Sequence, residues 1–321
     1  MIDVLAQRLL FALLLVVIVS SAALLLARLA PGDVTAQLGP FASPTEIADT
    51  RARFGLDRSP ATQWAMWVGR ATRFDFGDSF LYSRPVRGLV LGAAANTAIL
   101  AVAALAVATL IGIPLGIVSG SRRGPGAGLV RAMSLMCLSV PPLLTSLLLV
   151  FVAARTGWFP TGGMTSTSAL DLRGLAWLLD VAHHMVLPVL ALALPIAATF
   201  ERLQAQSMAE TLHQPFTIAA MARGLSWRHV VVRHAWRVSL RPICGIYGLV
   251  IGALLSGSFA VEFVTAWPGL GRLMYEALRA RDIYLVAGCA AMGGFFLAVG
   301  SVVGDALLAA ADPRVRERQA A

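Results

Sequence analysis

Side chains able to hold a metal or carry out covalent chemistry are few and widely spaced in this chain. Three cysteines lie in separate apolar segments with no paired spacing: Cys137, Cys244 and Cys289. His183 and His184 are adjacent, but no further histidine stands at a ligand's spacing from them. Ser256 and Ser258 lack a His or Lys base in a matching segment, which a serine nucleophile needs. These patterns predict neither a metal site nor a catalytic site in this chain.

One basic, amphipathic stretch, residues 219–241, separates two long apolar segments. Its alanines favour a short helix before Gly224, and a glycine there suits a left-handed helix stop. Ser226 can cap a second helix beginning at Trp227. On that helix basic residues recur every fourth position and should share one face: His229, Arg233, Arg237 and Arg241. Such a projection could bind another protein, although a helix lying on lipid fits the same pattern.

The composition is that of a membrane protein. Of 321 residues, 58% are hydrophobic and only 13% are charged, with a mean hydropathy of +0.75, whereas about a quarter of a soluble domain is charged. The net charge is +9 and all 26 basic residues are arginine. Without lysine the chain cannot form a P-loop, so ATP-driven work would need a partner. The arginines flank apolar segments, which indicates a cytoplasmic membrane surface and no nucleic-acid partner.

The apolar pattern predicts an all-α membrane protein with six spans, each of roughly the 20 residues that cross a bilayer: residues 9–27, 96–118, 132–154, 185–200, 243–264 and 285–310. Pro141 and Pro142 should kink the third span, and Gly248 and Gly252 should allow close helix packing in the fifth. The expected organisation is an N-terminal segment with the first span, an extracytoplasmic excursion, a five-helix core holding a loop over about 201–242, and a tail: 1–30, 31–92, 93–311 and 312–321.

Charge predicts the orientation. The turn 119–131 carries three arginines and no acid, the loop 201–242 six arginines against two glutamates, and the tail 312–321 three arginines against two acids. The segment 155–184 is balanced, with two arginines and two aspartates. The positive-inside bias therefore places the basic segments and both termini in the cytoplasm. The arginines of the long excursion count little in this comparison.

The stretch from Ala219 to Pro242 resembles the cytoplasmic coupling motif of ABC importer permeases, in which Glu-Ala-Ala, three residues and Gly precede a basic helix. Further motifs, in the order of the dipeptide/oligopeptide/nickel branch, extend the resemblance over nearly the whole chain. They are Pro31-Gly32-Asp33, Gly55-Leu56-Asp57, Phe76-Gly77-Asp78-Ser79, Arg84-Pro85-Val86, Ile113-Pro114-Leu115-Gly116, Ser139-Val140-Pro141, Trp158-Phe159-Pro160, Leu255-Ser256-Gly257-Ser258, Trp267-Pro268-Gly269-Leu270-Gly271 and Asp312-Pro313-Arg314-Val315-Arg316.

The resemblance implies the transmembrane domain of a type I ABC importer in a bacterial inner membrane. Such a chain pairs with a second permease, two ATPase subunits that bind ATP and Mg, and an extracytoplasmic substrate-binding protein, with lipid around it. It implies coupling contacts at Ala219, Ala220, Arg223, Gly224, Leu225, Ser226, His229, Arg233 and His234. Candidates for the translocation path or for extracytoplasmic contacts are Asn96, Ser139, Pro141, Ser258, Glu262 and Trp267.

Several observations leave alternatives open. Ile218 stands where the motif has Glu, and Arg223 stands where Lys is common. Glu262 could attract a cationic substrate or pair with an arginine, and Asn96 and Ser139 could instead bond neighbouring helices. The substrate could be a di- or oligopeptide or a nickel or other metal chelate, with a slight lean towards the chelates. A secondary transporter or an intramembrane enzyme would function without an ATPase, but the chain shows neither paired intramembrane charges nor a catalytic constellation.

Overall fold

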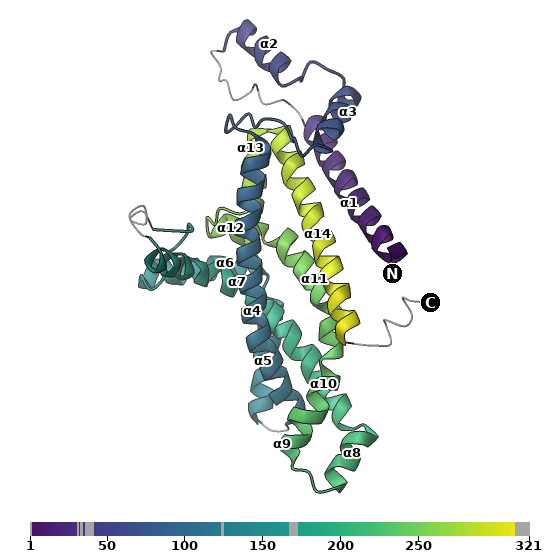
Figure 1. Cartoon of the computed structure of the whole chain (residues 1–321). Coiled ribbons are helices and arrows are strands. Elements are labelled where there is room, and N and C mark those ends of the chain that lie inside the picture. Colours follow the sequence, from purple (N-terminus) through teal and green to yellow (C-terminus); the bar gives the residue numbers. More distant parts are fainter. Residues whose placement is uncertain are drawn as a thin grey trace. The chain divides into compact units, whose positions relative to one another are not determined.

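The computed structural model describes residues 2–30, 32, 35, 42–122, 125–166 and 173–311, and side chains are described from Leu10 onwards apart from Ser256 and 308–311. The predicted tail 312–321 lies outside the described residues, as do Pro31 and Asp33 of the first motif. The helices are α1 (Ile2–Leu29), α2 (Pro44–Arg53), α3 (Pro60–Ala71), α4 (Val86–Ser121), α5 (Pro125–Ser139), α6 (Pro142–Thr156), α7 (Leu175–Leu212), α8 (Pro215–Ala222), α9 (Trp227–His229), the π-helix η3 (Val230–Ala235), α10 (Trp236–Ser239), α11 (Arg241–Gly257), α12 (Phe259–Val264), α13 (Leu270–Ala280) and α14 (Ile283–Ala311) (Figure 1).

The described residues confirm an all-helical membrane fold. Outside the helices they contain a single isolated β-bridge, between Asp78 and Pro85. Five helical segments are long and apolar enough to cross a membrane: Leu10–Leu29, Val86–Ser121, Leu175–Leu212, Arg241–Val264 and Ile283–Leu307. The helices extend beyond the predicted spans because their polar ends continue the helix, so the expected boundary at residue 93 falls inside α4.

The third predicted span is broken at its prolines. Helices α5 and α6 meet at a bend of 100° and make a sixth span only if the bent pair crosses the membrane as one. Pro141 stands at the N-cap of α6 in extended backbone, and Pro142 begins that helix. Proline has no N–H to donate and clashes with the preceding turn, so the pair ends one helix and starts another. The double proline is thus a full break, stronger than the expected kink.

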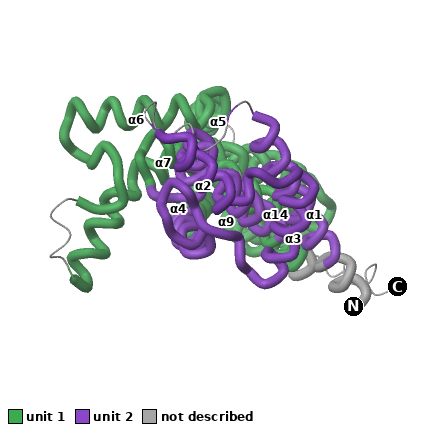
Figure 2. The backbone as a smooth tube through the Cα atoms, turned by 90° about the horizontal axis from the view of Figure 1, so that it is seen from above, with its two compact units in different colours: residues 1, 98–267, 299–321 green, residues 2–97, 268–298 purple. Residues whose placement is uncertain are grey.

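The chain divides into two compact units, coloured separately in Figure 2. Unit 2 comprises residues 2–97 and 268–298. Its excursion is folded: Ser43 and Ser59 cap α2 and α3 with their side chains. Gln63, fully buried, donates to the carbonyls of Gly55 and Arg58 at 2.8 and 3.1 Å. These capped helices and buried hydrogen bonds show that the described part of the excursion is folded.

Unit 1 comprises residues 98–267 and 299–321 with Met1. Its longest helix, α7, packs against α5, α6 and α11, and α12 packs against α6. The predicted close packing of the fifth span is confirmed: a Cβ on Gly248 or on Gly300 would overlap the backbone of the opposite helix, α14 or α11. Small residues allow such contact between helices where lipid offers no hydrophobic drive to associate.

Candidate functional site

The predicted coupling loop is anchored to the end of α7 by one buried threonine. After α7 ends at Leu212, Pro215 starts α8 at a position where its missing N–H costs nothing. Thr217, fully buried, directs its hydroxyl towards the carbonyls of Gln214, Leu212 and Thr211 at 2.7, 3.0 and 3.1 Å. The single hydroxyl hydrogen is shared among carbonyls at the end of α7 and in the turn that follows, and it ties the start of α8 to that turn.

Gly224 reverses the chain after α8 with the left-handed conformation that the sequence predicts, at φ +86°. The Gly224 amide donates to the Met221 carbonyl at 2.9 Å and the Leu225 amide donates to the Ala220 carbonyl at 3.3 Å. This pair of bonds is a Schellman motif, which closes a helix end. Ser226 occupies the predicted N-cap of α9, but its side chain accepts no capping hydrogen bond.

An apolar core holds the two halves of the loop together on α7. It consists of buried residues from α7, α8 and η3, with Ile117 and Met221 packed against it: Met208, Leu212, Ala220, Val230, Val231 and Ala235. Ala220, a predicted contact residue, is therefore part of this core. The loop is a small folded projection of unit 1, and in Figure 1 its helices α8, α9 and α10 gather at one end of α7.

The second helix of the loop is not a single regular α-helix. Residues 230–235 form a π-helix, in which each hydrogen bond encloses one more residue than in an α-helix. The local backbone therefore differs from the regular α-helix on which the predicted basic face rests, and that shared face stays a prediction. His229 approaches His234, five residues on, with ring centroids 5.8 Å apart. A sequence periodicity of four cannot reveal this inserted residue.

The tip of the projection exposes apolar side chains beside basic ones. The large apolar residues exposed there are Phe216, Ile218, Leu225 and Trp227. Ile218, in the position where the motif has Glu, is 53% exposed. Most predicted contact residues lie on the surface of the projection, namely Ala219, Arg223, Gly224, Leu225, Ser226, His229 and Arg233, while His234 is half-buried. Exposed apolar patches rimmed by charge are typical of binding surfaces.

The predicted path residues do not form one site. The Ser139 hydroxyl donates a hydrogen bond to the Leu135 carbonyl of the same helix at 2.8 Å, at the end of α5 before the break at Pro141. Ser258 donates to the Glu262 carboxylate at 2.6 Å, and both side chains are buried. Asn96, in unit 2, donates to the Pro268 carbonyl at 2.8 Å. Each residue makes a local contact, and their role in a path stays a prediction.

Trp267 is fully buried within the chain. Its amide donates to the Glu262 carbonyl at 2.9 Å, and Ala266 beside it holds a positive φ of 51°. The indole therefore supports the turn after α12, and an external contact of this motif would have to use the turn's surface.

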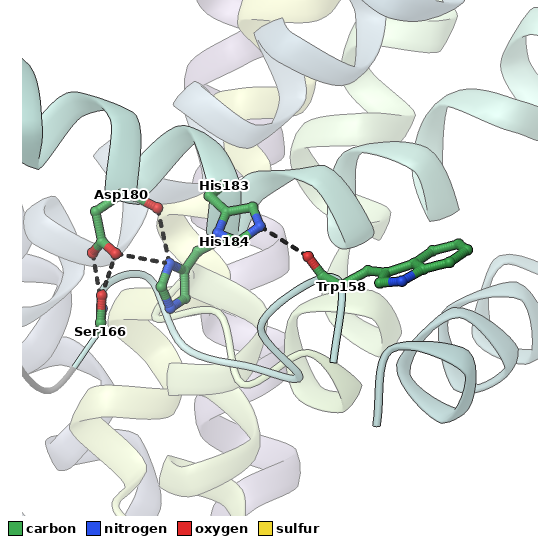
Figure 3. A network of polar contacts seen from close by, with 5 residues as sticks. All are labelled: Trp158, Ser166, Asp180, His183 and His184. Atoms are coloured by element: carbon green, nitrogen blue, oxygen red, sulfur yellow. Dashed lines mark hydrogen bonds and ion pairs between the residues drawn. The ribbon is translucent and has the colours of Figure 1, made fainter. Parts of the chain in front are cut away.

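Two groupings of polar contacts were not predicted from the sequence, although some of their residues were named there. In Figure 3, Asp180 accepts bonds from the amide and hydroxyl of Ser166, and His184 donates to the Asp180 carbonyl at 2.8 Å. His183 contacts the Trp158 carbonyl at 3.1 Å. The network ties the loop after α6 to the start of α7. Within the residues that the structure describes, no group of three His, Cys, Asp or Glu side chains is placed to hold a metal.

The second grouping is a set of buried polar side chains beside the coupling loop: Ser119, Glu201, Gln204 and Ser239. Glu201 and Gln204 lie three residues apart on α7 and so project from one face of it. In the sequence, only the spacing of these two polar residues, just after the apolar segment 185–200, could have indicated this buried polar grouping.

A family model supplies the decisive comparison: the model described as "Binding-protein-dependent transport system inner membrane component" matches residues 112–317. The chain belongs to this family. It is therefore a multi-pass membrane permease component of an ABC transporter, and ATP hydrolysis lies in partner subunits. In general terms the family implies a partner permease, an ATPase and a substrate-binding protein.

Relatives of this permease align over most of their length. A putative peptide permease protein of Brucella ovis is 33% identical over 297 residues, covering 91% of this chain and 92% of the relative. The oligopeptide transport system permease protein AppB of Bacillus subtilis is 30% identical, covering 89% and 90%. The oligopeptide transport system permease protein OppB of Mycobacterium bovis is 32% identical, covering 85% and 86%.

Proposed function

We propose that this permease and a homologous second permease form the path through which an ATP-driven importer takes up oligopeptides. The observation that carries the proposal is the projection of residues 213–239, a folded loop with an apolar core and an exposed apolar tip. A rigid, apolar-tipped projection suits a groove on an ATPase subunit, because docking would bury the tip's exposed area. ATP and Mg would then be bound by the two ATPase subunits.

The proposed orientation follows from charge. The projection and the turn 119–131 carry most of the unbalanced arginines, so the positive-inside bias supports a cytoplasmic position for both. With six spans, both termini lie in the cytoplasm as well. The loop 157–174 then faces the opposite side, where an extracytoplasmic binding protein would deliver the substrate.

The proposed substrate class rests on the relatives. The three described above carry the word peptide or oligopeptide in their names. No relative among them is named for nickel, so the lean towards metal chelates gains no support. The delivering binding protein would carry much of the choice between peptides, because it makes the first contact with the substrate.

The proposal is tested by purifying the permease with its partners and reconstituting it in liposomes. We expect a second permease and P-loop ATPases to co-purify, and uptake of labelled oligopeptides to require ATP and the binding protein. G224W, which puts a bulky side chain on a left-handed residue, should lose the ATPases while the second permease stays bound. A permease that purifies alone and transports without ATP would contradict the proposal and favour a secondary transporter.

A further inference from the structure

Four buried polar side chains of unit 1 connect α4, α7 and α10, and we call them the polar clasp: Ser119, Glu201, Gln204 and Ser239. The Ser119 hydroxyl donates to the Glu201 carboxylate. The Gln204 amide nitrogen donates to the Ser239 hydroxyl at 2.7 Å. Each of the four is at most 1% exposed, so water does not compete for these bonds.

The clasp joins the exit of the coupling loop to the helices of the membrane core. Ser239 is the last residue of α10, shortly before α11 begins at Arg241, and its hydroxyl also lies 3.0 Å from the Trp236 carbonyl. On the other side, Ser119 stands in the last turn of α4, where its carbonyl accepts from the Arg131 guanidinium of α5 at 2.6 Å. A displacement of α10 therefore reaches α7 through Gln204, and α4 through Glu201.

Helices α4 and α7 are held in backbone contact along the same stretch. Gly112, Gly116 and Gly120 recur every four residues on α4, and a Cβ at any of them would overlap α7 at Ala197, Glu201 or Ala205. Interiors packed this closely transmit strain, so a shift of α7 is passed to α4 where the two helices touch. A displacement that the clasp passes to α7 is therefore also passed to the C-terminal part of α4, which holds these glycines and Ser119.

The clasp is poorly explained as packing alone. Within the residues that the structure describes, one oxygen of Glu201 and the amide oxygen of Gln204 are buried without a hydrogen-bond partner. Apolar side chains of the same size would fill this space without leaving polar atoms unpaired. A polar cluster kept inside a membrane protein despite that cost is by default a candidate for function.

We propose that Gln204 and Ser239 are positioning residues that transmit the position of the coupling loop to α7 and α4. The inference rests on the proposed function, because it assigns the means by which a docked ATPase moves this permease. Without the hydrogen bond, the loop would still bind the ATPase but its motion would reach the spans weakly. ATP would then be consumed without a matching transport of substrate.

The test compares ATP hydrolysed with peptide transported by the reconstituted complex. We expect Q204L and S239A to raise the ATP consumed per peptide at least fivefold, measured per assembled complex. S239T keeps the hydroxyl and should stay within twofold of the unaltered complex. Q206L is the matched control, because Gln206 lies on the exposed face of α7 and bonds Glu210 at 3.0 Å. The double variant Q204L/S239A should be no worse than either single one.

Three results would overturn the inference: an unaltered ratio in both Q204L and S239A, equal impairment of S239T and S239A, or additive effects in the double variant. If Q204L fails to assemble, the comparison of S239A with S239T decides alone. An unaltered complex without ATP-dependent uptake would instead count against the proposed function, so the two failures are distinguishable.

Discussion

The coupling loop of unit 1 and the excursion of unit 2 both lie outside the apolar spans, but they are held together in different ways. The loop folds on six buried apolar residues, and its side-chain hydrogen bonds are mostly local, such as those of Thr217. The excursion is tied by polar contacts between distant segments. The Asp282 carboxylate accepts a hydrogen bond from the Ser79 hydroxyl at 2.7 Å. The Tyr284 hydroxyl donates to the Phe54 carbonyl at 2.8 Å, and the Arg28 guanidinium donates to the Leu56 carbonyl at 2.7 Å.

The difference indicates what each region has to do. A projection with its own apolar core can keep its shape while its outer surface binds another chain and moves with it. The excursion also buries Leu56 and Trp67, but it depends in addition on directional bonds to α1 and to the segment 268–298 of unit 2. Changes to buried polar groups should therefore harm the excursion most, and changes to apolar volume should harm the loop.

The largest effect is expected for Asp282→Ala. Asp282, 2% exposed, accepts from the Ser79 hydroxyl, from the Leu81 amide at 3.1 Å and, as a cap of α14, from the Leu285 amide at 3.1 Å. Loss of an acceptor of three hydrogen bonds, two of them buried, should cost about 3 to 4 kcal/mol of local stability. Amide exchange over residues 79–86 should accelerate, while exchange in the loop stays unchanged. Asp49→Ala, an exposed change in the same unit, serves as the control.

Met208→Ala should have the opposite distribution of effects, destabilising the loop and leaving the excursion unchanged. Met208 is fully buried in the loop core, and removing such a side chain costs about 3 kcal/mol. We expect faster exchange over residues 213–239 and weaker retention of the ATPases, with the excursion unaffected. Equal damage to both regions would show that the two do not respond independently.

Gly224→Ala should have a smaller effect, confined to the loop. An alanine at φ +86° costs about 1 to 2 kcal/mol, although open space surrounds the position. The control is Gly128→Ala in α5, where the backbone is helical and a Cβ also meets open space, so a slight gain in stability is expected. Thermal unfolding of the purified complex compares the two. A loss as large in Gly128→Ala would contradict the assignment of strain to Gly224.

The smallest effect is expected at Tyr82, on the surface of the excursion. Burial, and then the hydrogen bond that its hydroxyl donates to Glu276, raise the pKa of Tyr82 to about 12. The folded state thus favours the protonated phenol. Its contribution to stability is complete below the ordinary pKa of 10 and is lost as the pH rises towards 12. Tyr82→Phe should flatten this alkaline loss in a pH series of unfolding curves, and an unchanged series would contradict it.

Much of the fold follows from the sequence, because long apolar runs leave few choices in lipid. The five long spans, the left-handed Gly224 and the close packing at Gly248 were predictable from residue types, whereas the prolines at 141 and 142 predicted a kink and make a full break. The π-helix at 230–235 was not, because it inserts a residue without changing composition. The partners of Glu201 and Gln204 come from other helices, and sequence spacing along one helix cannot supply them. Trp267 was a candidate for the path or for an extracytoplasmic contact, and its burial depends on tertiary packing that the motif does not show.

The central claim is that the tip of the loop touches the ATPase. A photo-crosslinking amino acid in place of Ile218 tests it directly in native membranes, with Trp158, exposed in the loop after α6, as the matched position. We predict a crosslinked product of permease plus ATPase from position 218 and none from position 158. No ATPase product from position 218, or the same product from both positions, would contradict the account.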